Sequence, residues 1–121
     1  MYTYNAKLDR IVDGDTLDAN IDLGFDITIH KRIRLAGIDT PESRTRDLEE
    51  KARGLASKER LKELLEGGEF VVESKEVGKY GRVLGTLLVY NGEDLPININ
   101  ETLVQEGFAV EYWGGKKKKK K

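Results

Sequence analysis

The clearest pattern of apolar and polar positions lies in residues 26–35, DITIHKRIRL. Apolar and polar side chains alternate there, as they do in a strand that buries one face. The apolar positions are Ile27, Ile29, Ile33 and Leu35. The polar positions are Thr28, His30, Arg32 and Arg34. The alternation predicts a strand in which Arg34 points away from the core.

Four further segments have the character of strands, because turn residues separate stretches that favour extended backbone. They are YTYNAKLDRIV (residues 2–12), TLDANIDL (16–23), EFVVESKEV (69–77) and VLGTLLVY (83–90). The DGD of Asp13 to Asp15 predicts a tight turn between the first two segments, and Asn91-Gly92 ends the last. The chain is therefore expected to form five strands.

Two segments predict helices. The longer is RDLEEKARGLASKERLKELLEGG, from Arg46 to Gly68, where Gly67-Gly68 is a stop signal and Gly54 lowers the helix propensity. Its expected apolar face consists of Leu48, Ala52, Leu55, Ala56, Leu64 and Leu65. A second helix is expected from about Asn98 to Gly107, because Glu101 follows Asn98 at the spacing of a capping box.

The order β-β-β-α-β-β-α predicts a mainly β, α+β fold. Five short strands with a helix inserted after the third fit a small closed barrel of the OB type, with a second helix near the C-terminus. We expect one domain over residues 1–113 and a Gly-Gly plus polylysine tail over residues 114–121.

Composition narrows the chemistry. The chain has 121 residues, no cysteine and one histidine, His30, so any metal ligands should be oxygens. No stretch approaches the length of a membrane span, and the N-terminus lacks the layout of a signal peptide. The expectation from this chain is no membrane association and, by default, a cytoplasmic location.

The net charge is unevenly distributed. Without Lys116 to Lys121, the chain has 15 lysines and arginines and 22 acidic residues, which gives a net charge of −7. An acidic body binds nucleic acid poorly unless cations are placed locally or the tail helps. Two hypotheses stay open for the tail: an inert solubilising segment, or a tether to a polyanionic substrate.

Four carboxylates, those of Asp13, Asp15, Asp39 and Glu42, fall at two predicted strand ends. If the barrel brought these ends together, the repulsion would favour a bound cation, and oxygen ligands in loops suit Ca²⁺ or Mg²⁺. Each motif also has a simpler interpretation. DGD is typical of a polar turn, and KYGR, residues 79–82, is typical of a turn between strands.

Two further simple interpretations concern TPES and the arginines. Thr40 as N-cap, Pro41 at the first helical position and Glu42 in the first turn would make an ordinary helix start. Arg32 and Arg34 on a strand face could be merely solvated charges.

The combination and order of the motifs favour another interpretation. IVDGDTL, RLAGIDTPE, a helix, KYGR and NETLVQEGFA follow one another, and over residues 8 to 112 the chain resembles the staphylococcal nuclease (thermonuclease) family. The resemblance implies that Asp15, Asp39 and the backbone carbonyl of Thr40 bind calcium. It implies that Glu42 activates water and that Arg34 and Arg82 bind phosphate. It further places Lys79 and Tyr80 beside the terminal phosphate of a nucleotide.

The same resemblance implies a calcium-dependent nuclease that cleaves DNA and RNA at the 5′ oxygen and leaves 3′-phosphates. Single-stranded or frayed DNA is the expected preferred substrate, and a monomer is the expected state. The chain departs from the family in the segment around DLGFD, in a short connection before KYGR and in ending soon after EYWGG. Two alternatives remain: an inactive module that binds nucleic acid or protein, and a domain in which calcium is only structural.

Overall fold

The computed structural model describes residues 2–77, 83–90, 92 and 95–112. The long strands are β1 (Tyr2–Asp13), β2 (Thr16–Gly24), β3 (Ile27–Leu35), β5 (Glu69–Val77) and β6 (Val83–Val89). The short strands are β4 (Ile38–Asp39), β7 (Ile97–Asn98) and β8 (Val110–Glu111), and the helices are α1 (Leu48–Leu64) and α2 (Ile99–Gln105).

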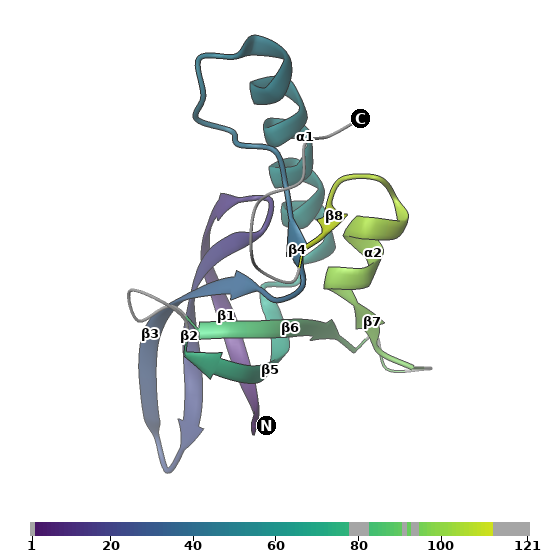
Figure 1. The fold of residues 1–121 in the computed structure, drawn as a ribbon. Coiled ribbons are helices and arrows are strands. Elements are labelled where there is room, and N and C mark those ends of the chain that lie inside the picture. Colours follow the sequence, from purple (N-terminus) through teal and green to yellow (C-terminus); the bar gives the residue numbers. More distant parts are fainter. Residues whose placement is uncertain (1, 78–82, 91, 93–94, 113–121) are drawn as a thin grey trace.

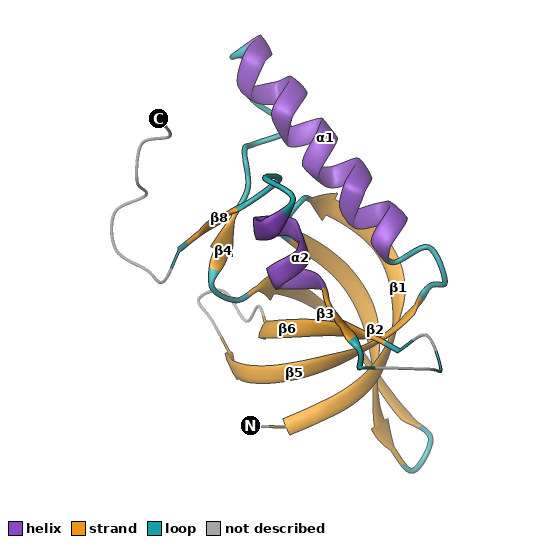
Figure 2. Ribbon diagram, turned by 90° about the vertical axis from the view of Figure 1, so that its right-hand side faces the viewer, coloured by secondary structure: helices purple, strands orange, loops and turns teal. Residues whose placement is uncertain are grey.

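The five long strands close into a barrel, which confirms the predicted OB-type fold. They pair in the order β3-β2-β1-β5-β6, and a parallel pairing of β3 with β6 joins the two ends. The short strands add an extension, β7 on β6, and a separate ribbon of β4 with β8. Both helices lie towards one end of the barrel, whereas the β2–β3 turn projects from the other (Figures 1 and 2).

Side chains on the inward-facing positions of the strands fill the interior of the barrel. The buried core includes Leu17, Ala19, Ile33, Leu35 and Leu87, each at most 1% exposed. The predicted inward face of β3 is correct only near its C-terminal end, because Ile27 is 54% exposed. Ile27 follows a two-residue turn formed by Phe25 and Asp26, and there the hairpin has run beyond the barrel.

The predicted apolar face of α1 is buried only at the C-terminal end, where Leu65 is in the core and Leu64 packs against it. Leu48 and Leu55 are exposed, and the buried positions of α1 are Gly54, Ser57 and Leu61. The small residues let the helix backbone approach its neighbours, and the Ser57 Oγ donates to the Phe108 carbonyl at 2.6 Å. Close backbone approach therefore decides which face of α1 packs inward.

The start of α1 also differs from the helix-start interpretation of TPES. The N-cap is Asp47, whose Oδ1 accepts hydrogen bonds from the amides of Glu49 and Glu50. Residues 40–47 are consequently a loop that runs from β4 to the helix. The second helix agrees with its prediction, since Asn98 caps α2 by accepting from the Glu101 amide. Among the described residues, no helix is long and apolar enough to cross a membrane.

Gly54 has a packing role that its helix propensity does not suggest. A Cβ at this position would lie 2.5 Å from the carbonyl carbon of Glu42 and 2.7 Å from the amide nitrogen of Ser43. These atoms belong to the loop backbone, which cannot turn aside as a flexible side chain could. Gly54 therefore fixes how closely the 40–47 loop lies against α1.

We predict that Gly54→Ala destabilises the protein. Alanine should gain up to about 1 kcal/mol from helix propensity, but crowding of the loop should cost about 1–3 kcal/mol. Urea unfolding of Gly54→Ala should show a lower free energy of unfolding than the parent protein. Gly67→Ala is the control, because a Cβ there meets nothing within 4 Å, and it should change the free energy of unfolding by less than about 0.5 kcal/mol. An increase in stability for Gly54→Ala would contradict the packing role.

Candidate active site

Three segments converge at the helix-bearing end of the barrel. They are the β1–β2 turn with Asp13 and Asp15, the end of β3 with Arg34, and the loop that follows β4. The backbone joins the first two, because Thr16 pairs with Arg34 and the Leu35 amide donates to the Asp15 carbonyl at 2.9 Å. The register of β2 and β3 therefore sets Arg34 beside Asp15.

The Asp15 carboxylate is buried, with the residue 7% exposed, and it accepts hydrogen bonds at both oxygens. The Thr16 hydroxyl donates to Oδ1 at 2.9 Å, and the Thr40 amide donates to Oδ2 at 3.0 Å. The second bond ties the β1–β2 turn to the loop after β4. Thr40 does not cap α1, because Asp47 holds the N-cap position.

Arg34 lies between two carboxylates. Its Nη2 is 3.5 Å from the Asp15 Oδ2 and 3.4 Å from the Asp39 Oδ1, and its Nη1 donates to the Leu35 carbonyl at 2.9 Å. The Arg34 side chain is only 16% exposed, so these interactions are partly shielded from water. One cation thus holds together two carboxylates that would otherwise repel.

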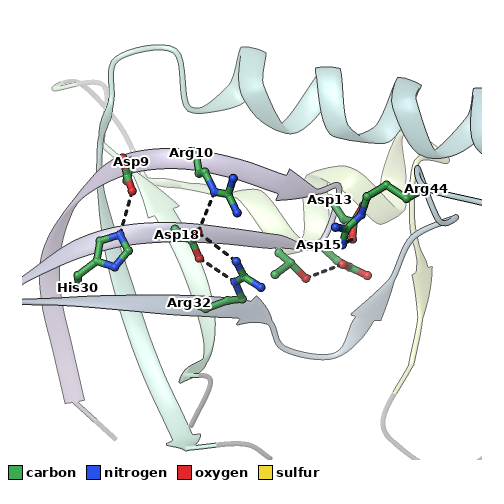
Figure 3. Close-up of polar contacts among 9 residues, drawn as sticks. Asp9, Arg10, Asp13, Asp15, Asp18, His30, Arg32 and Arg44 are labelled. Atoms are coloured by element: carbon green, nitrogen blue, oxygen red, sulfur yellow. Dashed lines mark hydrogen bonds and ion pairs between the residues drawn. The ribbon is translucent and has the colours of Figure 1, made fainter. Parts of the chain in front are cut away.

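Glu42 lies at the edge of this group, in the exposed part of the loop. Its amide donates to Glu50 Oε2 at 3.1 Å, which ties the loop to α1. Glu42, Asp13 and Arg44 line an open hollow of about 420 Å³. Asp13 accepts a hydrogen bond from the Ser43 hydroxyl and lies 3.8 Å from Arg44 (Figure 3). Glu42 therefore borders a space that a ligand can enter.

A larger hollow of about 1120 Å³ lies elsewhere, beside β1 and the β2–β3 turn. It is lined by none of the predicted site residues that the structure describes. The convergence of charged groups, rather than the size of a cavity, identifies the candidate site.

The structure brings together Asp15, Arg34, Asp39 and Thr40, with Glu42 at the rim. Lys79, Tyr80 and Arg82, the other predicted site residues, lie outside the described residues, as does the run from Lys116 to Lys121. The described end of β6 starts at Val83, which pairs with Ile33.

The carboxylate oxygens at this site are of the kind that bind hard cations. Within the described ranges, no three side chains of His, Cys, Asp or Glu are grouped as a metal cage. Asp15 and Asp39 nevertheless approach one nitrogen atom, so a positive charge is already accommodated between them. Two hard carboxylates suit Ca²⁺, which would complete its six to eight oxygen ligands with backbone carbonyls and water. The residues present therefore fit an open, water-filled site better than a closed one.

Two supporting residues were not predicted from the sequence. Asn100, at 5% exposure, accepts from the Leu87 amide and donates to the carbonyls of Ala36 and Gly85, so it joins α2 to the residue after β3 and to the middle of β6. Gly14 lies so close to α1 that a Cβ would be 2.6 Å from the Cβ of Ser57. Their only sequence signals were an asparagine inside a helical motif and a glycine between two aspartates.

Comparison with known proteins identifies the family of the chain. The family model described as staphylococcal nuclease homologue matches residues 32–121. The chain is 40% identical over 113 residues to a micrococcal nuclease of Shigella flexneri, covering 90% of this chain and 59% of that protein. It is 34% identical over 111 residues to Protein ParB of Escherichia coli, covering 85% of this chain and 54% of that protein.

A third relative is the endonuclease YhcR of Bacillus subtilis, 30% identical over 118 residues, which cover 91% of this chain and 9% of that protein. The chain thus spans little more than half the length of the first two relatives, and a small part of the third. The family model matches well over half of this chain, and the matched part includes Arg34, Asp39 and Glu42. The chain belongs to the staphylococcal nuclease family.

Proposed function

We propose that this chain is a calcium-dependent nuclease that hydrolyses phosphodiester bonds of DNA and RNA at the 5′ oxygen and leaves 3′-phosphate products. The observation that carries the proposal is the contact of one half-buried arginine, Arg34, with both Asp15 and Asp39, at the base of the loop that bears the exposed Glu42. Family membership and the names of two relatives, a micrococcal nuclease and an endonuclease, support the same reaction class.

The chemistry needs positive charge around a pentacoordinate phosphorus and a base for the attacking water. Arg34 is held by Asp15, Asp39 and the Leu35 carbonyl, so its planar fork is oriented before substrate arrives. In the proposed reaction Glu42 takes a proton from water, the water oxygen bonds to phosphorus, and the bond to the 5′ oxygen breaks. The departing oxygen then takes a proton from solvent.

Asp15, Asp39 and the Thr40 carbonyl would hold the calcium ion. Bound there, Ca²⁺ would add positive charge next to the phosphate and offset the two carboxylates. Arg82 is proposed as a second phosphate ligand, with Lys79 and Tyr80 contacting the terminal phosphate. Single-stranded or frayed DNA is the proposed preferred substrate because a separated strand enters an open site without the cost of unpairing.

Metal dependence is the first prediction for this site. Ca²⁺ should activate cleavage of single-stranded DNA, and chelation should abolish it. Binding to the folded state should also raise the unfolding free energy, by about 2.7 kcal/mol at a concentration 100 times the Kd. Asp39→Asn should lose most of this calcium-dependent stabilisation, which thermal unfolding measures without any turnover. Full activity in excess EDTA would contradict the calcium proposal.

Glu42→Gln should lower kcat by about 10²- to 10⁴-fold, the range for loss of a general base. The side chain is exposed, so the unfolding free energy should change little. Glu59→Gln, an equivalent exposed change on α1, is the matched control and should leave kcat intact. Near-normal turnover of Glu42→Gln would assign proton abstraction to another group.

Arg34→Lys should lower kcat by about 10²-fold or more. The lysine ammonium cannot contact the Leu35 carbonyl and both carboxylates and at the same time offer a planar pair of donors to phosphate. Arg53→Lys, on the exposed surface of α1, serves as the control for the same chemical change. Single-turnover rates of the two variants on one oligonucleotide make the comparison. Equal rates would remove Arg34 from the proposed reaction.

A further inference from the structure

A second group of arginines lies on the outer face of the barrel, next to the candidate active site. Arg10 of β1, Asp18 of β2 and Arg32 of β3 occupy paired positions on three adjacent strands. Figure 3 shows Asp18 between the two guanidiniums, with Asp15 and Asp13 farther along the same sheet. We call Arg10, Asp18 and Arg32 the arginine pair site.

Asp18 holds both arginines in place. Arg32 donates from Nε to Oδ1 at 2.8 Å and from Nη2 to Oδ2 at 3.2 Å, and Arg10 donates from Nε to Oδ2 at 3.0 Å. The Asp18 side chain is only 9% exposed beneath them. The hydrogen bond from Arg32, with a smaller contribution from Arg10, lowers the Asp18 pKa to about 2, so the carboxylate stays ionised at neutral pH.

The two guanidiniums keep donors for another ligand. Each has five N–H groups, and the bonds to Asp18 engage one nitrogen of Arg10 and two of Arg32. The side chains remain 65% and 42% exposed. One carboxylate opposite two guanidiniums leaves a net positive charge, in a body whose overall balance is acidic.

The two neighbouring carboxylates, those of Asp9 and Asp13, each contact a side chain outside the arginine pair site. Asp9 lies 2.9 Å from His30 on one side, and Asp13 lies 3.8 Å from Arg44 on the other. Asp13 also acts electrostatically on Arg32 and helps to raise its pKa. Arg10 and Arg32 therefore carry one positive charge more than the Asp18 carboxylate that both of them contact.

The register relates this site to Arg34. Arg32 and Arg34 are two residues apart on β3, opposite the core residues Ile33 and Leu35, so they share the outer face. Two strand residues span about 7 Å, which is of the order of one nucleotide step in an extended single strand. A phosphate held at Arg34 would thus leave the next phosphate near Arg32.

We propose that Arg10 and Arg32, aligned by Asp18, form a second phosphate-binding site that holds the phosphate next to the scissile one in a single-stranded polynucleotide. This inference rests on the proposed nuclease function, since it extends the path of the same substrate. It assigns to Arg32 a role beyond that of a solvated charge.

The test measures binding of a fluorescently labelled single-stranded oligonucleotide of 12 deoxythymidines by anisotropy at several salt concentrations. All proteins carry Glu42→Gln and the buffer contains chelator, so binding is measured without cleavage. Arg10→Gln should raise Kd several-fold at low salt and reduce the slope of log Kd against log salt by about 0.7, the value for one phosphate contact on a single strand. Arg32→Gln should do the same.

The controls separate binding from folding. Arg60→Gln removes an equal charge from α1, where Arg60 is paired with Glu106, and should leave the slope unchanged. Arg10→Gln keeps the two bonds between Arg32 and Asp18, so it should fold even if Arg32→Gln does not. With Glu42 restored and Ca²⁺ present, kcat/KM for a diester of dinucleotide size should stay within about twofold in Arg10→Gln.

The second site would be overturned if Arg10→Gln left the slope of log Kd against log salt unchanged, or if Arg60→Gln reduced that slope as much as Arg10→Gln does. Either result would leave the proposed nuclease function intact. Absence of any oligonucleotide binding to the parent protein would also overturn the second site, whereas calcium-dependent cleavage by the unmodified chain tests the nuclease function separately. Loss of slope in Arg10→Gln together with no cleavage by the unmodified chain would support the second site and reject only the catalytic proposal.

Discussion

The site depends on one electrostatic arrangement: the carboxylates of Asp15 and Asp39 both approach the same nitrogen of Arg34. Two carboxylates a few ångströms apart would repel by roughly 4 kcal/mol at a protein-surface dielectric. The guanidinium between them offsets that repulsion, and the Thr40 amide and Thr16 hydroxyl satisfy the oxygens of Asp15. The barrel makes this possible because strand pairing fixes Thr16 opposite Arg34, and the ribbon of β4 with β8 holds Asp39.

Close backbone packing supports the exposed part of the site. Gly14 lets the β1–β2 turn approach Ser57, and Gly54 lets the loop bearing Glu42 lie against α1. The stability of α1 and the placement of Glu42 are therefore coupled, and the helix gives up propensity at Gly54 to accommodate the loop. Outside this loop, the arginine pair site places a carboxylate between two guanidiniums on the outer face of the sheet (Figure 3).

The barrel and much of the site could be predicted from the sequence, because strand periodicity and ordered motifs are local signals. Arg34 was expected to point away from the core, and Ile33 and Leu35 are indeed buried on the opposite face. The packed face of α1 could not be predicted from apolar residues, because Gly54 and Ser57 lie inward through backbone proximity. The helix starts at Leu48 because Asp47 caps it. The bond between the Thr40 amide and Asp15 joins residues 25 positions apart, so no local pattern reveals it.

The most direct measurement of the central claim is a crystal structure of the Glu42→Gln protein with Ca²⁺ and a short single-stranded oligonucleotide. The account predicts a cation with oxygens of Asp15 and Asp39 at about 2.3–2.6 Å and a phosphate against Arg34. A cation bound away from both carboxylates, or an oligonucleotide seated in the hollow beside the β2–β3 turn, would contradict it.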